Sequence, residues 1–330
     1  MTTQTRSGFR TIALPFLPLV RTHRALACVL VLALLPWLIP NHSVAINILV
    51  YGLYGVGFNL VFGYMGMLSF GHAAFLGAGA YAAGILIAHA QWPWWAAIPA
   101  GTAAAALLAL AIGLLAIRTR GIYFAMVTLA LSQCVYFLVY QAPLSGGENG
   151  LRGVNVPVLR LGPWQVDLLD PVNRYYAFLV LAGLVILALS RILASPFGGA
   201  VEAVRENEAR ARACGFHVEK IKLTAFVLSG AICGLAGALG AIHLSSVAIE
   251  TMHYEMSGLV VMLCLLGGMG TFFGPFVGAA LFLLIQDTFS LWTEHWQLYV
   301  GLVFMFFVLF FPRGVWGTIL ATLPEKSHDR

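Results

Sequence analysis

The sequence predicts an all-α, polytopic membrane protein of about ten transmembrane helices. Hydrophobic residues make up 60% of the 330 positions and charged residues only 9%, whereas soluble domains carry about 25% charged residues. The apolar residues also fall into long runs that short polar segments separate. Too few polar side chains remain to cover a soluble globule. A disordered chain and a disulfide scaffold are excluded as well, because hydrophobicity is high and the five cysteines are scattered.

A transmembrane helix needs roughly 20 apolar residues, or about 17 when it is short. The apolar runs predict spans at residues 25–40, 44–62, 73–90, 94–117, 122–142, 175–194, 223–243, 256–272, 275–291 and 297–311. The first run is short and follows a basic segment, so it also resembles a signal peptide, with Ser43-Val44-Ala45 as a weak cleavage-like sequence. We interpret it as an uncleaved span because apolar sequence resumes at once.

Glycine-rich sequence interrupts two of these apolar stretches, at residues 63–79 and 256–291. The first contains GYMG at 63–66 and the second contains GGMG at 267–270. Broken helices are tolerated in membranes where protein covers them, so full spans and re-entrant pairs both remain open here. The number of spans is compatible with five-plus-five inverted halves, which the sequence does not establish.

Basic residues predict the direction of the spans. Arginine and lysine collect in the segment 1–24, at 118–121, in the segment 195–222 and after residue 312. By the positive-inside rule these segments are cytoplasmic. The transmembrane domain then covers residues 25–312, with cytoplasmic tails at 1–24 and 313–330, and the long loop 143–174 lies outside.

Small residues form stripes along several predicted spans. Gly230, Gly234 and Gly237 share one helix face, which lets a neighbouring helix approach closely. We interpret such residues as helix-packing positions, with a pore lining as the alternative. The full set comprises Gly63, Gly66, Ser69, Gly71, Gly230, Gly234, Gly237, Gly267, Gly268, Gly270 and Gly274.

Ionisable residues are nearly absent from the predicted spans. Glu250 and Glu255 fall in a predicted outer loop, and His72 falls near a predicted span end. A proton-driven carrier normally places a carboxylate inside the membrane, so this pattern argues against one. The sequence also has no P-loop, no nucleophile elbow and no zinc-ligand motif, and no tract resembles a nucleic-acid arm. It therefore predicts neither an enzyme nor a cofactor or metal site.

The segment 195–222 is the most informative polar stretch. Residues 200–213 are expected to form one short helix, which Gly215 ends. Glu206 with Arg210 and Glu208 with Arg212 are i,i+4 pairs in the favourable order. A charged helix held at the membrane face suits the docking of a cytoplasmic partner. A solvated connecting helix is the alternative.

This segment also carries a resemblance to a known family. AVRENEARARACGFHVEKIKLTAF is similar to the cytoplasmic coupling loop of branched-chain amino acid ABC permeases of the LivM type. Further blocks resemble the same family in the same order: GYMGMLSFGHAAFLGAGAY, GIYFAMVTLALSQ, SGGENGL and LLGGMGTFFGPFVGAALF. Together they cover roughly residues 44–312, and Ser145 stands where relatives often have threonine.

The resemblance implies an inner-membrane permease that pairs with a second, related permease subunit. It implies two cytoplasmic ATP-binding subunits that drive transport and a periplasmic binding protein that delivers substrate. In this picture the coupling loop uses Glu202, Arg205, Glu206, Asn207, Glu208, Ala211 and Gly215. The outer loop would form a mouth or lid near the binding protein with Ser145, Gly146, Gly147, Glu148, Asn149 and Gly150, or else serve as a solvated connector.

The substrate is less defined by the sequence. Branched-chain or related amino acids are what the resemblance implies, and relatives of this subunit also serve urea and short amides. A facilitative channel or ion-coupled carrier is the alternative from another class. A membrane enzyme comes third, because no catalytic constellation supports it.

Overall fold

The computed structural model describes residues 24–39, 41–154, 159–161, 164–166, 168–293, 295–311 and 313–321. Within these ranges the chain is almost entirely helical, which confirms the all-α prediction. Apolar helices occupy the positions of the ten predicted spans: α2 (Arg24–Leu38), α3 (His42–Asn59), α4 (His72–Ala88), α5 (Trp94–Ala116), α6 (Ile122–Gln141), α7 (Pro171–Leu193), α10 (Val218–Leu244), α11 (Tyr254–Gly267), α12 (Gly274–Ser290) and α13 (Trp296–Phe310). The predicted N-terminal tail lies, apart from Arg24, outside the described residues.

These helices differ in whether they can cross a bilayer alone. Six helical stretches are long and apolar enough, among them α3 with its π-helical continuation η1 (Leu60–Tyr64). The helices α2, α4, α11 and α12 are shorter. With 14 residues, α11 is about 21 Å long, against a hydrocarbon core of about 30 Å. It therefore crosses only part of the membrane, so the predicted span 256–272 is a broken one.

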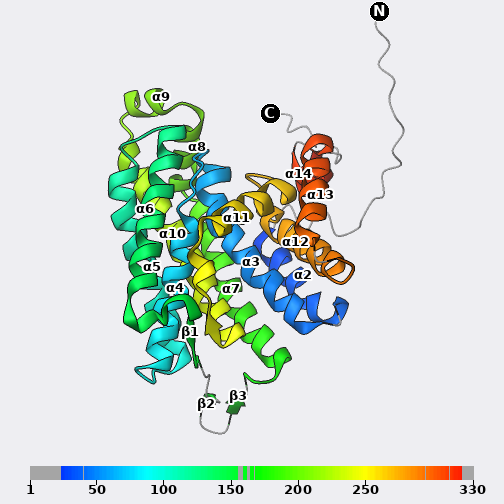
Figure 1. Cartoon of the computed structure of the whole chain (residues 1–330). Coiled ribbons are helices and arrows are strands. Elements are labelled where there is room, and N and C mark those ends of the chain that lie inside the picture. The colour runs from blue at the N-terminus through cyan, green and yellow to red at the C-terminus, as the bar shows by residue number, and fades with distance from the viewer. Residues whose placement is uncertain are drawn as a thin grey trace, which may run out of the picture.

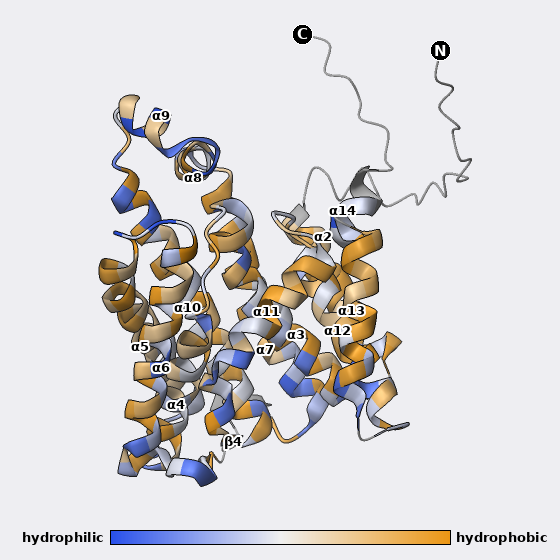
Figure 2. Ribbon diagram, turned by 45° about the horizontal axis from the view of Figure 1, so that its top comes forward, coloured by the Kyte–Doolittle hydropathy of each residue, from blue (hydrophilic) through white to orange (hydrophobic). Residues whose placement is uncertain are grey.

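Polar elements lie at the two ends of the helix bundle. The helices α8 (Pro196–Glu206) and α9 (Glu208–Ala213) project from one end, and β1 (Leu151–Arg152), β2 (Leu159–Leu161) and β3 (Trp164–Val166) lie at the other (Figure 1). Hydropathy follows the same division, with hydrophilic residues concentrated at these ends (Figure 2). The described part of the loop 143–174 and the helices α8 and α9 of the segment 195–222 are thus at opposite ends of the bundle, as the predicted topology requires.

The helix α10 is the centre of the packing, and its glycines bring it close to α4 and α5. A Cβ atom on Gly230 would overlap the side chain of Ala109 in α5. One on Gly237 would overlap the backbone carbonyl of Leu76 in α4. In lipid, where burial alone does not drive helices together, such close approach gives the dispersion contacts that do.

The last helix belongs to the predicted C-terminal tail. The helix α14 (Gly314–Ala321) packs against α11 and α12. The rings of Trp316 and Phe273 lie 5.1 Å apart between their centroids. The described part of this tail is therefore attached to the membrane helices.

Candidate functional site

The polar segment at the α8–α9 end consists of two helices, so the prediction of one helix over residues 200–213 is wrong. Asn207 has extended backbone angles, φ −158° and ψ 102°, and separates α8 from α9. Its side-chain oxygen accepts a hydrogen bond from the backbone N–H of Arg210 at 2.9 Å. Asparagine caps a new helix better than it continues an old one. The predicted pair of Glu206 with Arg210 needs a continuous helix, and the described contacts do not include it.

Gly215 ends α9 as predicted. Its φ of +88° lies in the left-handed region that a side chain disfavours. The N–H of Phe216 donates to the carbonyl of Ala211 at 3.1 Å, and that of Gly215 donates to the carbonyl of Arg212 at 3.0 Å. These two bonds form a Schellman motif, which fixes the angle at which the chain turns from α9 towards α10.

Glu208 connects three parts of this end of the protein. Its carboxylate lies 2.8 Å from Lys222 Nζ in α10 and 3.1 Å from Arg120 between α5 and α6. The predicted pair with Arg212 is present at 3.4 Å. Partial burial alone would raise the pKa of Glu208, but the hydrogen bond and charge of Lys222, with Arg120 and Arg212, lower it below its ordinary value.

The remaining predicted coupling residues divide into an exposed set and a buried anchor. Glu202, Arg205, Glu206 and Asn207 are exposed at this end, as is Gly215. Ala211 is buried in a small cluster with Val204 and Val218. The anchor holds α9 against α8 and the start of α10, and leaves a charged outer surface. We call the exposed residues of α8 and α9, with Asn207, the α8–α9 surface.

Beneath this surface, the two predicted glycine-rich interruptions meet. A Cβ on Gly63 would overlap the backbone nitrogen of Gly270, 207 positions later in the chain. Asn59 joins the two segments, because its amide donates to the carbonyl of Thr271 at 2.9 Å and accepts from the N–H of Gly270 at 3.0 Å. Both GYMG and GGMG thus serve one contact at the α8–α9 end.

Arg205 links the α8–α9 surface to this contact. Gly66 and Gly270 both have positive φ, +73° and +69°, and both turns lie against the Arg205 side chain. A Cβ on Gly66 would be 3.3 Å from Arg205 Cγ, and one on Gly270 would be 3.6 Å from its Nη1. A hollow of about 600 Å³ lies beside Gly66 and Arg205 and extends to Glu208. Movement of α8 therefore reaches both turns directly.

The helix α4 begins inside the bundle, and side chains accept hydrogen bonds from backbone N–H groups just before and at its start. The N–H of Phe70 donates to Thr128 of α6 at 3.2 Å, and that of Ala73 donates to Ser257 of α11 at 2.9 Å. The N–H of Gly71 donates to Ser69 Oγ at 3.2 Å. Irregular backbone at this depth is stable because protein groups replace water as acceptors.

His72 is the first residue of α4, so it lies at a helix end as predicted, and it is fully buried at the centre of this crossing. Ser229 Oγ of α10 donates to the carbonyl of Gly57 in α3 at 2.5 Å, so it accepts from His72 Nε2, 2.9 Å away. His72 Nδ1 then accepts from the hydroxyl of Ser69 at 3.1 Å. This assignment follows from the donor count of the network. It ties α4 and α10 to α3.

The segment before α11 enters the bundle from the β1 end, and it is not a regular α-helix. Met252, in the 3₁₀ helix η4 (Ile249–Met252), fills the space over Gly77 of α4. The hydroxyl of Tyr54 donates to the carbonyl of Met256 at 3.3 Å. Tyr54 is near the midpoint of the helical stretch His42–Tyr64. The first turn of α11 therefore lies beside the middle of α3, and Glu255 belongs to that turn and not to an outer loop as expected.

The predicted outer mouth is a compact turn at the β1 end. Ser145 is buried, and its hydroxyl contacts the carbonyls of Val139 and Ala142 at 2.6 and 2.7 Å. Gly146, Gly147 and Gly150 all have positive φ. A Cβ on Gly150 would overlap the carbonyl of Val247 in the short strand β4 (Ser246–Val247), while Glu148 and Asn149 are exposed. The turn thus covers the start of the path that leads to η4.

The other predicted glycines lie at backbone contacts inside the chain. A Cβ on Gly267 would overlap the backbone of Gly274, and Gly268, with φ +120°, lies against the carbonyl of Arg313. Gly71 lies against Thr128 of α6, and Gly234 against Ala105 of α5. These positions fit the helix-packing interpretation.

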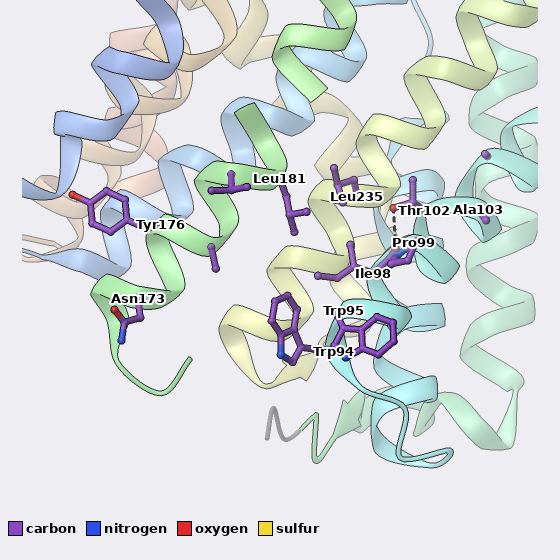
Figure 3. A pocket seen from close by; sticks show the side chains of 13 residues that line it. Trp94, Trp95, Ile98, Pro99, Thr102, Ala103, Asn173, Tyr176, Leu181 and Leu235 are labelled. Carbon is purple, nitrogen blue, oxygen red and sulfur yellow. Dashed lines mark hydrogen bonds between the residues drawn. The ribbon is translucent and has the colours of Figure 1, made fainter. Parts of the chain in front are cut away.

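A larger hollow, about 880 Å³, opens between α5 and α7 and is almost wholly apolar (Figure 3). Trp94, Ile98 and Leu181 line it, and Asn173 lies towards one end. It offers a polar solute few partners. Among the described residues there is also no group of three His, Cys, Asp or Glu side chains that could hold a metal ion.

Comparison with known proteins decides the family. The model of the family described as "Branched-chain amino acid transport system / permease component" matches residues 42–311. This chain belongs to that family. The permease family is a transport family and not an enzyme family, and the matched residues include the whole contact between the two glycine-rich segments and all of α8 and α9.

Individual relatives agree with the family match. The high-affinity branched-chain amino acid transport system permease protein LivM of Escherichia coli K12 is 31% identical over 313 residues, which cover 88% of this chain and 74% of that protein. LivM of Salmonella typhimurium is 30% identical over the same shares. The permease protein LivH of Escherichia coli K12 is 24% identical over 81% of this chain and 91% of its own length. No solved structure matches.

Proposed function

We propose that this permease is one membrane subunit of an ABC importer for branched-chain amino acids in the inner membrane. A second, LivH-like permease subunit would complete the membrane part. Two cytoplasmic ATP-binding subunits would drive transport, and a periplasmic binding protein would deliver substrate. In this arrangement both termini and the α8–α9 surface face the cytoplasm.

The α8–α9 surface is the observation that carries this proposal. It is a pair of short charged helices, stiffened by two caps and by the Glu208 ion pairs, at the end of a membrane bundle. The sequence holds no P-loop, so an importer of this family needs a separate ATP-binding partner. A stiff helix pair with exposed charge suits the groove of such a partner.

Two contacts give the partner a route into the membrane. Arg205 touches the turns at Gly66 and Gly270, which precede α4 and α12. Glu208 binds Lys222 at the start of α10, and α10 carries Ser229 to the His72 crossing. A rigid-body shift of α8 and α9 would therefore move the broken helix ends and the central helix together.

The outer turn has a place in the same proposal. Residues 145–150 would meet the binding protein, because Glu148 and Asn149 are exposed at the end opposite α8 and α9. The buried Ser145 and the three positive-φ glycines hold this turn in one shape. Replacing Gly146 and Gly147 by valine should impair uptake, because positive φ is costly for a branched side chain. Unchanged uptake would leave the turn as a connector.

Reconstitution tests the proposal directly. The complete complex in proteoliposomes should take up L-leucine only with ATP on the cytoplasmic side and binding protein on the other. Uptake of urea or a short amide, and not of leucine, would change the substrate. Uptake that needs neither ATP nor a binding protein would identify a channel or carrier and overturn the proposal.

A further inference from the structure

Glu255 carries a carboxylate that lies level with the middle of the membrane helix α3, and other described residues of this chain leave most of its side chain uncovered. It stands in the first turn of α11, beside Tyr54 at the middle of α3 and Ala73 at the start of α4. Its side chain is 74% exposed, and His253 Nδ1 lies 3.9 Å from its carboxylate. Hydrophilic residues mark the beginning of α11 between mostly hydrophobic helices (Figure 2).

Lipid cannot be the neighbour of this carboxylate. A charged side chain at the centre of a membrane helix is costly in lipid, and such groups face a cavity or a protein interior. The buried faces of α11 and η4 are already filled by Ser257 and Met252. The exposed face of the same segment therefore borders water or a polar surface.

The helix α6 continues this polar face. The ring of Tyr136 lies 5.5 Å from that of His253 between centroids. One turn earlier on α6, Ser132 Oγ and Gln133 Nε2 are buried and have no hydrogen-bond partner among the described residues. Ser132 is completely buried. Polar atoms left unpaired inside a protein are destabilising, so these two atoms point to a ligand or water at this place.

We propose that Gln133, Tyr136, His253 and Glu255, here called the polar strip, line the substrate path of this subunit and bind a zwitterionic amino acid. The carboxylate of Glu255 accepts hydrogen bonds from the substrate ammonium group. The amide of Gln133 donates to the substrate carboxylate, with Ser132 beside it. The side chain of the substrate then meets the apolar residues around the strip. This inference rests on the proposed function, because it takes that importer's substrate.

The polar strip also accounts for the positions of two irregular segments, the one before α4 and the one before α11. The segment from β4 through η4 descends beside α4 from the outer turn to the start of α11. The helix α4 begins next to that point, where Ala73 meets Ser257. The N-terminal ends of α4 and α11 thus meet beside the strip.

Cysteine labelling in the assembled complex tests whether the strip borders water. Cys134 and Cys214, the exposed native thiols of the described residues, are first replaced by serine. A charged, membrane-impermeant thiosulfonate should then modify Tyr254→Cys, and L-leucine with binding protein should reduce that modification. Leu138→Cys, on the exposed apolar side of α6, is the matched control and should stay unmodified. If Tyr254→Cys behaves like this control, the strip faces lipid or a dry interface and the inference is wrong.

Uptake tests the role of the charge. Glu255→Gln keeps the shape but loses one charged hydrogen bond, so L-leucine uptake should fall about tenfold or more. Asp287→Asn removes an exposed carboxylate elsewhere, near the end of α12, and should leave uptake unchanged. Full uptake by Glu255→Gln would overturn the binding role. If the unsubstituted complex imports no amino acid with ATP, the proposed function fails. The labelling still shows whether the polar strip borders water.

Discussion

The ammonium group of Lys222 lies 2.8 Å from the carboxylate of Glu208 and fastens α9 to the first turns of α10. The Lys222 side chain is only 8% exposed, whereas surface lysines normally extend into water. Arg120 reaches the same carboxylate from the loop between α5 and α6. One carboxylate therefore holds the α8–α9 surface both to α10 and to the loop between α5 and α6.

Removing this carboxylate should loosen α9 selectively. Glu208→Gln leaves the nearly buried Lys222 without its charged partner, which should cost about 1–3 kcal/mol of local opening free energy. Glu206→Gln is the matched control, because Glu206 is exposed and should change that energy little. Hydrogen exchange of the amides at 208–213 measures the difference. Equal protection in both variants would show that the ion pairs do not hold α9.

The same carboxylate should make α9 sensitive to acid. The pKa of Glu208 in the folded protein is lower than its ordinary value of 4.5. The contribution of Glu208 to the stability of α9 is therefore complete above pH 4.5 and is lost as the pH falls through the folded pKa. Protection of residues 208–213 should therefore decline below about pH 4.5 in the unsubstituted protein. In Glu208→Gln this decline should be absent, and a decline of the same size would assign it to another group.

The break between α8 and α9 should depend on one side chain. Asn207→Ala removes the acceptor for the N–H of Arg210 and should cost about 1 kcal/mol of α9 stability. Asn207→Asp keeps an acceptor oxygen and should restore it. Exchange of the Arg210 amide reports the cap directly. Protection in Asn207→Ala that matches the unsubstituted protein would contradict this role.

Two glycines of α10 should differ sharply in their tolerance of a methyl group. At Gly237 a Cβ would overlap the Leu76 carbonyl, so Gly237→Ala should destabilise the protein by about 1–3 kcal/mol. At Gly240 the nearest atom would be 3.6 Å away, so Gly240→Ala should be neutral or slightly stabilising. Unfolding in detergent compares the two. Similar stabilities would mean that α4 can shift away from α10 without cost.

The sequence predicts the membrane helices well and the contacts between them poorly. Apolar run length locates the ten helices, since it reflects bilayer thickness. The break at Asn207 is not predicted because the Ala, Arg and Glu residues around it favour helix, although asparagine before a glutamate is itself an N-cap signal. The depth of Glu255 depends on where α11 starts relative to α3, and no local pattern encodes that. The meeting of Gly63 with Gly270 likewise joins distant segments that only the fold brings together.

The most direct test of the account is photo-crosslinking from position 206 in the assembled complex. A photoreactive residue in place of Glu206 should yield a product that contains the ATP-binding subunit, since this exposed position ends α8 next to the break. The same group in place of Asp287, near the end of α12, should yield none. A position-206 product that lacks the ATP-binding subunit, in a complex that still hydrolyses ATP, would contradict the claim that the α8–α9 surface is where the ATPase docks.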